Sequence, residues 1–223
     1  MTKKSFQMAT MRDNKLGRPP GGIGWIVNKN FPFEIDCSFI NDKISLISYG
    51  SQSIIGVYLL NGSQSTKRDQ HEEMLHKTIA LANEQKINGR ETIIIGDLNT
   101  DPTRNKINDA IDTKIINESG LVFLEAMLLQ KTTYSYKSPI GQSWIDHVLV
   151  DDSSRENIQV NIISSVHNMS DHNALSLDRE HFIMENKDTE ELSSCNSSNN
   201  INQTKHIKQK WTNKNYKVRN RIN

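Results

Sequence analysis

The chain has 223 residues, 35% of them apolar, and its 27 basic and 26 acidic residues leave a net charge of +1, which gives no overall electrostatic argument for a nucleic-acid partner. Two isolated cysteines, Cys37 and Cys195, fit neither a disulfide framework nor a zinc site and favour a reducing, intracellular compartment, either nucleus or cytoplasm. Residues 1–14 carry charges and no apolar core, and no run approaches membrane-spanning length, so we expect neither a signal peptide nor a membrane partner.

Strands and one long helix are predicted in the first half of the chain. The strands cover Gly22–Asn28, Lys43–Tyr49 and Ser53–Leu59, and the helix covers Thr66–Gln85. Packing on a core explains the apolar face of this helix, which comprises Met74, Leu75, Thr78, Ile79 and Ala82.

The β-branched run Thr92–Ile95 predicts a strand buried on both faces. Gly96 allows a sharp turn at its end, and Pro102 prevents a return to the sheet. Asp97 and Asn99, two residues apart, are expected to point the same way from the carboxyl end of the strand, where open α/β sheets place their chemistry. A polar turn after a core strand is the alternative interpretation.

The second half predicts a helix over Asn105–Asn117, a segment Leu121–Gln130 that fits helix or strand equally, and then strands over Thr132–Tyr136, Ser143–Val150, Ile158–Val166 and Ala174–Leu177. Tyr134 and Tyr136 share a strand face, so they belong either to the core or to a base-stacking surface.

Polar residues interrupt two of these apolar runs. In the first, alternation places Trp144, Asp146, Val148 and Val150 on one face. A carboxylate there is costly to bury unless it is paired or bound to a cation. In the second, Asp171 and His172 stand just before the last strand. Each feature alone could be a satisfied polar turn or an edge-strand charge.

Taken in order, G-D-x-N at 96–99, S-x-I-D at 143–146 and S-D-H at 170–172 resemble the carboxyl-terminal motifs of the endonuclease/exonuclease/phosphatase family, which includes deoxyribonuclease I. The resemblance runs from about Gly17 to about Asp178 and is greatest to endonuclease domains of non-LTR retrotransposons. Residues 17–24, G-R-P-P-G-G-I-G, are similar to the G-R-P-x-G-G segment of those domains, and residues 54–61 to their strand ending in Y-x-P-N, with Leu60 replacing the proline.

This resemblance implies an α/β fold, a deoxyribonuclease I-like two-sheet sandwich flanked by helices and incomplete at the amino terminus. It also implies Mg²⁺- or Mn²⁺-dependent phosphodiester hydrolysis on DNA. Asp97 would orient or deprotonate the attacking water, and Asn99 would donate to the phosphate. His172, held by Asp146, would contact the same phosphate. Asp171 would help to hold the metal, and the Tyr58 hydroxyl would touch the scissile phosphate.

One departure from the family pattern affects the expected activity. The family begins with a strand that bears an Asn, followed by a metal-binding Glu, and both precede the G-G strand. Residues 1–16 contain no glutamate, Asn14 lies on no predicted strand, and Glu34 follows the G-G segment. Because the loss of a primary carboxylate weakens a Mg²⁺ site, we expect a truncated copy or partial gene model with impaired activity.

We expect three regions: a short polar lead over 1–16, the family-like domain over 17–180, and a tail over 181–223 that is polar, then basic, and disordered. The basic part is interpreted as a nucleic-acid contact or as a solvated charged tail, and it resembles the linker to a reverse transcriptase domain in a longer parent chain. Its candidate contacts are Lys205, Lys208, Lys210, Trp211 and Lys214.

Three functions therefore remain open. The first is a Mg²⁺-dependent DNA endonuclease of a mobile element. The second is an inactive remnant that at most binds nucleic acid. The third is a phosphoinositide or sphingomyelin phosphodiesterase of the same family, which the retrotransposon-like segments disfavour.

Overall fold

A computed structural model describes residues 4–8, 22–62, 65–104, 106–128, 134–156, 158–164 and 168–179 of the chain. The basic tail residues proposed to contact nucleic acid, Cys195 and residues 9–21 lie outside these ranges. None of the described helices is long and apolar enough to cross a membrane.

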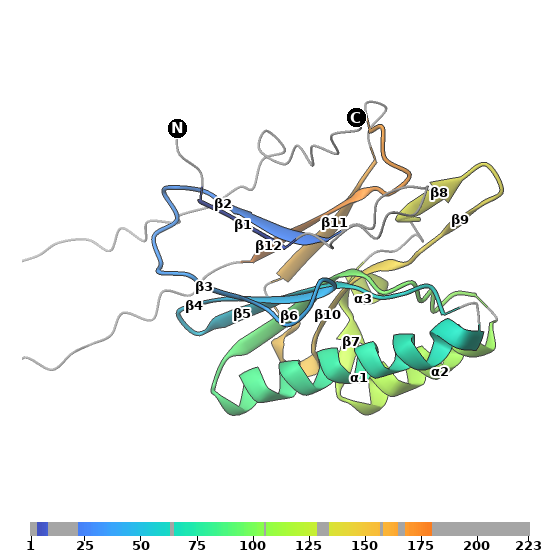
Figure 1. Ribbon diagram of the computed structural model, residues 1–223, viewed down its shortest axis with the longest axis horizontal. Coiled ribbons are helices and arrows are strands. Elements are labelled where there is room, and N and C mark those ends of the chain that lie inside the picture. Colours follow the sequence, from blue (N-terminus) through green and yellow to red (C-terminus); the bar gives the residue numbers. More distant parts are fainter. Residues whose placement is uncertain are drawn as a thin grey trace, which may run out of the picture.

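A six-stranded sheet forms the centre of the molecule (Figure 1). Strands β5 and β6 run parallel, and every other neighbouring pair in this sheet is antiparallel. In spatial order the strands are β3 (Asp36–Phe39), β4 (Ile44–Tyr49), β5 (Gln52–Tyr58), β6 (Glu91–Asp97), β10 (Asp146–Asp151) and β7 (Leu121–Phe123). The run Thr92–Ile95 thus lies between two neighbours, as its β-branched composition predicts.

Two helices, α1 (Ser65–Ile87) and α2 (Ile107–Glu118), cover one face of this sheet (Figure 1). The predicted apolar face of α1 is confirmed, because Leu75, Thr78, Ile79 and Ala82 are buried and Met74 packs against the same core. Sheet residues Ile44, Ile55, Val57, Ile94 and Leu149 complete this core.

The other face of the sheet is covered by two antiparallel strand pairs: β1 (Lys4–Met8) with β2 (Ile23–Val27), and β11 (Ile158–Ile163) with β12 (Ala174–Arg179) (Figure 1). A second core, including Ile93, Val148 and Val160, lies between the sheet and β11–β12. On the β2 side, the Trp25 indole donates to Ser45 Oγ at 3.0 Å. Helices, central sheet and second strand layer together confirm the predicted α/β sandwich.

Two sequence predictions are corrected between Leu121 and Val150. The segment Leu121–Gln130, predicted as either helix or strand, contains both, since strand β7 continues directly into helix α3 (Leu124–Leu128); its last two residues lie outside the described ranges. The strand predicted over Ser143–Val150 is broken: β9 (Gly141–Ser143) pairs with β8 (Tyr136–Ser138), and β10 begins only at Asp146. The break has a physical cause, because side chains take the backbone N–H groups between them. Asp101 accepts from Trp144 N, and Ser135 Oγ accepts from Ile145 N and Asp146 N.

Other boundaries also differ. Of the strand predicted over Thr132–Tyr136, residues 132–133 lie outside the described residues, and Tyr134 precedes the strand that begins at Tyr136, so the two tyrosines do not share a strand face. Two short strands escaped prediction, β1 within the polar lead and β3 before Lys43–Tyr49. Strand β1 pairs with β2 over its full length, so part of the lead joins the second strand layer. A 3₁₀ turn, η1 (Asp152–Ser154), follows β10.

Candidate active site

The candidate site begins where β6 ends. Gly96 has φ +148°, and a Cβ there would lie 1.9 Å from the Val57 carbonyl oxygen, so only glycine allows β5 and β6 to pair at this point. Beyond it, Asp97 Oδ1 accepts from the backbone N–H of Asn99 at 2.9 Å. Asn99 itself has the left-handed φ of 53°. The turn that G-D-x-N predicted is therefore a tight one, closed by the carboxylate itself.

Three residues of the prediction stand in one row across the sheet. Tyr58 is the register partner of Asp97, and Asp97 is the register partner of Asp146. Partners in a sheet point to the same face, which here is the face turned toward β11–β12. Lys43 extends the row by one strand: its carbonyl accepts from Tyr58 N at 2.9 Å, and its ammonium lies 4.5 Å from the Tyr58 ring centroid.

His172 completes the row at its other end. Its Nδ1 lies 2.8 Å from Asp146 Oδ2, and its ring meets the Tyr136 ring edge-on at a centroid distance of 5.0 Å. A backbone β-bridge between Tyr136 and His172 also holds His172 next to β8. The hydrogen bond to Asp146 raises the pKa of His172 above its ordinary value, against the opposing effect of burial. The predicted dyad is therefore formed, with the carboxylate fixing the imidazole.

Asp97 carries the most perturbed carboxyl group of the site. Burial and, second, the charge of Asp146 raise its pKa from 3.8 to about 7, although the Asn99 N–H and the charge of His172 oppose the shift. Two carboxylates that repel each other in a partly buried place each gain from a cation between them. This is the electrostatic character expected of a functional site rather than of a solvated turn.

A group of possible metal ligands follows from this geometry. Ligand atoms of Asp97, Asp146 and His172 all lie within 4.8 Å of one another, the one such group in the part of the chain that is described. Two carboxylate oxygens suit a hard divalent cation, so the residues fit Mg²⁺ or Mn²⁺. Asp171 is exposed and stands outside this group, although its charge contributes to the raised pKa of His172.

Asn99 has its side chain engaged already. Its amide Nδ2 donates to the Leu59 carbonyl at 2.8 Å, which ties the turn after β6 to the end of β5. An amide nitrogen carries two hydrogens, so one remains for a ligand. The structure thus brings all the predicted catalytic residues to one rim of the sheet, where β5 and β6 end and β10 begins. They are Tyr58, Asp97, Asn99, Asp146 and His172.

Sequence reasoning missed the polar residues that support this rim. Ser135 is fully buried and fixes the start of β10 through its hydroxyl. His147 and Glu125 are fully buried as well and contact each other. The only available signal was an imidazole within an apolar run, which requires a partner without identifying it.

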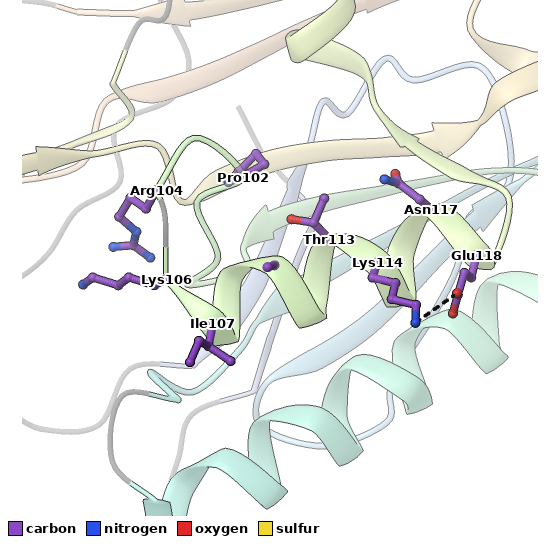
Figure 2. Close-up of a pocket in the computed structure, with 9 residues that line it drawn as sticks. Pro102, Arg104, Lys106, Ile107, Thr113, Lys114, Asn117 and Glu118 are labelled. Carbon is purple, nitrogen blue, oxygen red and sulfur yellow. Dashed lines mark ion pairs between the residues drawn. The ribbon is translucent and has the colours of Figure 1, made fainter.

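A separate hollow of about 650 Å³ lies along α2 (Figure 2). Arg104, Lys106 and Ile107 line one end, whereas Lys114 and Glu118, an ion pair at 3.7 Å, line the other. None of the four residues of the row (Tyr58, Asp97, Asp146 and His172) lines it. The hollow is therefore not part of the candidate site.

Comparison with known proteins gives a family and a fold. The sequence profile of the Endonuclease/Exonuclease/phosphatase family matches residues 7–172 of the chain. A comparison with curated protein sequences gives no match.

Three solved structures are similar in fold. A 3′ phosphatase from Neisseria bound to a product DNA hairpin is 14% identical, with a TM-score of 0.56 over 68% of this chain and 71% of its own. An AP endonuclease from Archaeoglobus fulgidus is 14% identical, with a TM-score of 0.55 over 67% of this chain and 72% of its own. The endonuclease domain of TRAS1, a telomere-specific non-LTR retrotransposon, is 15% identical, with a TM-score of 0.55 over 78% of this chain and 77% of its own.

Proposed function

Because the chain belongs to the endonuclease/exonuclease/phosphatase family, we propose that its candidate site hydrolyses phosphodiester bonds in DNA with the help of a divalent cation. The observation that carries this proposal is the Asp146–His172 dyad beside a carboxyl group, Asp97, whose pKa is about 7. Similarity to a phosphatase bound to a DNA hairpin, an AP endonuclease and a retrotransposon endonuclease favours DNA as the substrate.

Asp97 is suited to act on the attacking water. A general base works best when its pKa lies near the working pH, and the pKa of Asp97 is about 7 in the metal-free chain; a bound cation would lower it and favour the ionised form that accepts a proton. The Asn99 N–H holds the Oδ1 atom of this carboxylate, which leaves Oδ2 to orient a water and accept its proton. The turn that presents Asp97 is thereby also the element that orients it.

His172 and Asn99 are suited to bind the phosphate. With Nδ1 donating to Asp146, the Nε2–H of a protonated His172 is directed away from the dyad and can donate to a phosphate oxygen. The remaining N–H of the Asn99 amide can do the same. Both donors stabilise the negative charge that develops on the phosphoryl oxygens.

Tyr58 and Lys43 extend the site toward β4. The Tyr58 side chain is 39% exposed, so its hydroxyl can reach a substrate from the rim. Lys43 lies over the ring with its side chain 15% exposed, and its ammonium adds a positive charge beside the position proposed for the phosphate. Because the ring and Asp42, 4.0 Å from the ammonium, restrict this side chain, Lys43 is suited to bind a phosphate with less loss of side-chain freedom than a mobile surface lysine.

The cation would be held by the carboxylates of Asp97 and Asp146, while His172, with both ring nitrogens donating, would bind the phosphate rather than the cation. When bound, Mg²⁺ or Mn²⁺ supplies charge neutralisation on the phosphoryl and leaving oxygens. The ligand group within the described residues contains no glutamate, and Asp171 stands outside it. Fewer carboxylates mean weaker binding, so the proposal includes low metal affinity and slow turnover.

Plasmid nicking in Mg²⁺ tests the proposal. Wild type is expected to convert supercoiled plasmid to the open circular form, and Asp97→Ala is expected to lose that activity. Equal nicking by both proteins would remove Asp97 from the mechanism. If neither nicks but both bind DNA, the second candidate function holds, an inactive nucleic-acid-binding domain, which the absence of glutamate from the described ligand group favours.

Three further predictions stay proposals. The basic tail residues Lys205, Lys208, Lys210, Trp211 and Lys214 are proposed to add DNA affinity, as clustered cations do on a polyanion. Similarity to the TRAS1 domain supports an origin in a retrotransposon and, through it, an association with a reverse transcriptase. The domain limits of 17–180 also remain a proposal.

A further inference from the structure

Thr100, the residue after Asn99, is linked by hydrogen bonds on both of its sides. It is buried, with 1% of its surface exposed. Its hydroxyl donates to Asp112 Oδ2 at 2.8 Å, and its carbonyl accepts from His147 Nε2 at 2.7 Å. The hydroxyl also has a local acceptor, the Leu98 carbonyl, at the longer distance of 3.3 Å. The bond to α2 is therefore the better formed of the two.

On the helical side, Asp112 gathers donors from α1. His71 Nε2 lies 3.0 Å from the same Asp112 oxygen, and Arg68 forms a bidentate pair with the carboxylate at 2.6 and 3.1 Å. The second ring nitrogen of His71 donates to the Leu60 carbonyl at 2.6 Å, just beyond β5. Burial lowers the pKa of His71, and the bonds to Asp112 and Leu60 more than offset it, so both ring nitrogens can carry protons.

On the strand side, His147 continues the series. Its Nδ1 contacts Glu125 Oε1, and Glu125 Oε2 accepts from Val148 N at 3.0 Å. Both side chains are fully buried. Hydrogen bonds thus run without a gap from α1 through α2 to Thr100, and onward to β10 and α3. We call this series the buried polar chain; its members are Arg68, His71, Asp112, Thr100, His147 and Glu125.

The backbone beside this chain has a conformation that needs support. Among the described residues, Asn99 is the one non-glycine residue with positive φ, at 53°. Such conformations persist where the surroundings leave the backbone no alternative, and they gather at functional sites. Asn99 is held on one side by Asp97 and Leu59, whereas the buried polar chain holds the residue that follows it.

We propose that Thr100 is a positioning residue of the candidate site, and that the buried polar chain acts through it to hold Asn99 in the left-handed conformation that directs Asp97 and the Asn99 amide at the substrate. The inference rests on the proposed function, since it concerns the same site. Thr100 touches neither substrate nor cation. Its effect is to fix the turn between β6 and the loop that follows.

Three variants test this role. Thr100→Val removes the hydroxyl and keeps the side-chain shape, whereas Thr100→Ser keeps the hydroxyl. Thr78→Val is the matched control. Thr78 is also buried, with 2% exposure, and its hydroxyl donates to the Met74 carbonyl within α1, so it is not a member of the buried polar chain. Each protein is compared by plasmid nicking at saturating Mg²⁺ and by amide hydrogen exchange of Asn99.

Thr100→Val is expected to lower kcat about ten- to a hundredfold with KM for DNA changed less than about twofold, as for the loss of a group behind an active-site ligand. Its Asn99 amide is expected to exchange about tenfold faster. Thr100→Ser is expected to restore both properties, and Thr78→Val to match wild type.

Thr100→Val behaving like Thr78→Val in amide exchange or in kcat would overturn the inference, as would a Thr100→Ser protein no better than Thr100→Val. Failure of the proposed function is a separate result: wild type would not nick DNA. In that case the exchange of the Asn99 amide still decides whether Thr100 holds the turn.

Discussion

Nδ1 of His172 lies 2.8 Å from Oδ2 of Asp146, although 26 residues separate them in the sequence. Asp146 begins β10 in register with Asp97, while His172 follows the exposed residues 168–171 and lies just before β12. The dyad therefore joins the central sheet to the second strand layer at the rim where Asp97 stands. A carboxylate beside an imidazole determines both its orientation and its protonation.

Asp146→Asn should lower the pKa of His172, because the hydrogen bond to Asp146 is the main cause of its rise. A proton-detected titration of the imidazole signals measures this shift directly. We also expect about 10²- to 10⁴-fold slower nicking near neutral pH, since His172 would lose the hydrogen bond that fixes its orientation and favours its protonated form. Asp152→Asn, which removes an exposed carboxylate beyond β10, is the control and should leave both unchanged. An unmoved His172 titration in Asp146→Asn would refute the dyad.

The pKa of Asp97 should make stability depend on pH. In the folded chain the pKa is about 7 rather than 3.8, so the folded state holds a proton that the unfolded state has already released. The stabilisation is full below the ordinary pKa and is lost as pH rises through about 7. Asp97→Asn removes this dependence, so the Tm of the variant relative to wild type should rise between about pH 5 and about pH 8. A Tm difference that is constant over that range would contradict the assigned pKa.

Gly96→Ala should unfold or severely destabilise the chain. The new Cβ would lie 1.9 Å from a backbone oxygen of β5, and φ is +148°, so we expect a loss well above about 2 kcal/mol in denaturant unfolding. Gly50→Ala separates the two causes, because Gly50 has φ +52° with open space around it and should lose about 1 kcal/mol. Gly141→Ala has neither problem and should be near neutral. Equal losses of stability in Gly96→Ala and Gly50→Ala would mean that β5 and β6 move apart at little cost to admit the new Cβ.

Lys43→Met should weaken DNA binding and reduce its salt dependence. If the ammonium over Tyr58 contacts a phosphate, the slope of log K against log salt should fall by about 1, with no change in any sequence preference. Fluorescence anisotropy with a short labelled duplex measures the slope. Lys77→Met, on the exposed side of α1, is the matched control and should keep the wild-type slope. The same slope in all three proteins would exclude Lys43 from the site.

Local patterns in the sequence were sufficient for most of the elements. The β-branched run Thr92–Ile95 and the apolar face of α1 predict their own burial, because a strand or helix shows its environment through its own period. The row from Tyr58 to His172 followed from motif order and the family resemblance, and the strand register then places its members side by side.

What could not be predicted depends on contacts between distant segments. Side chains that accept from Trp144 N and Ile145 N end one strand and begin another, and Asp101 and Ser135 supply these acceptors from elsewhere in the chain. The pairs His71–Asp112 and His147–Glu125 likewise could not be predicted, because the sequence around either residue does not indicate its partner. A polar residue in an apolar run indicates that a hydrogen-bond partner is required, but only the fold shows which residue that partner is.

Calorimetric titration of the full chain with Mn²⁺ near neutral pH, for wild type and Asp97→Ala, tests the metal-dependent function most directly. Wild type should bind weakly, with Kd on the order of 10⁻⁴ to 10⁻³ M, as in sites with few charged ligands, and Asp97→Ala should show no binding in that range. The exposed control Asp152→Asn should bind like wild type. No binding by wild type, or equal binding by Asp97→Ala, would contradict a cation site formed by Asp97 and Asp146.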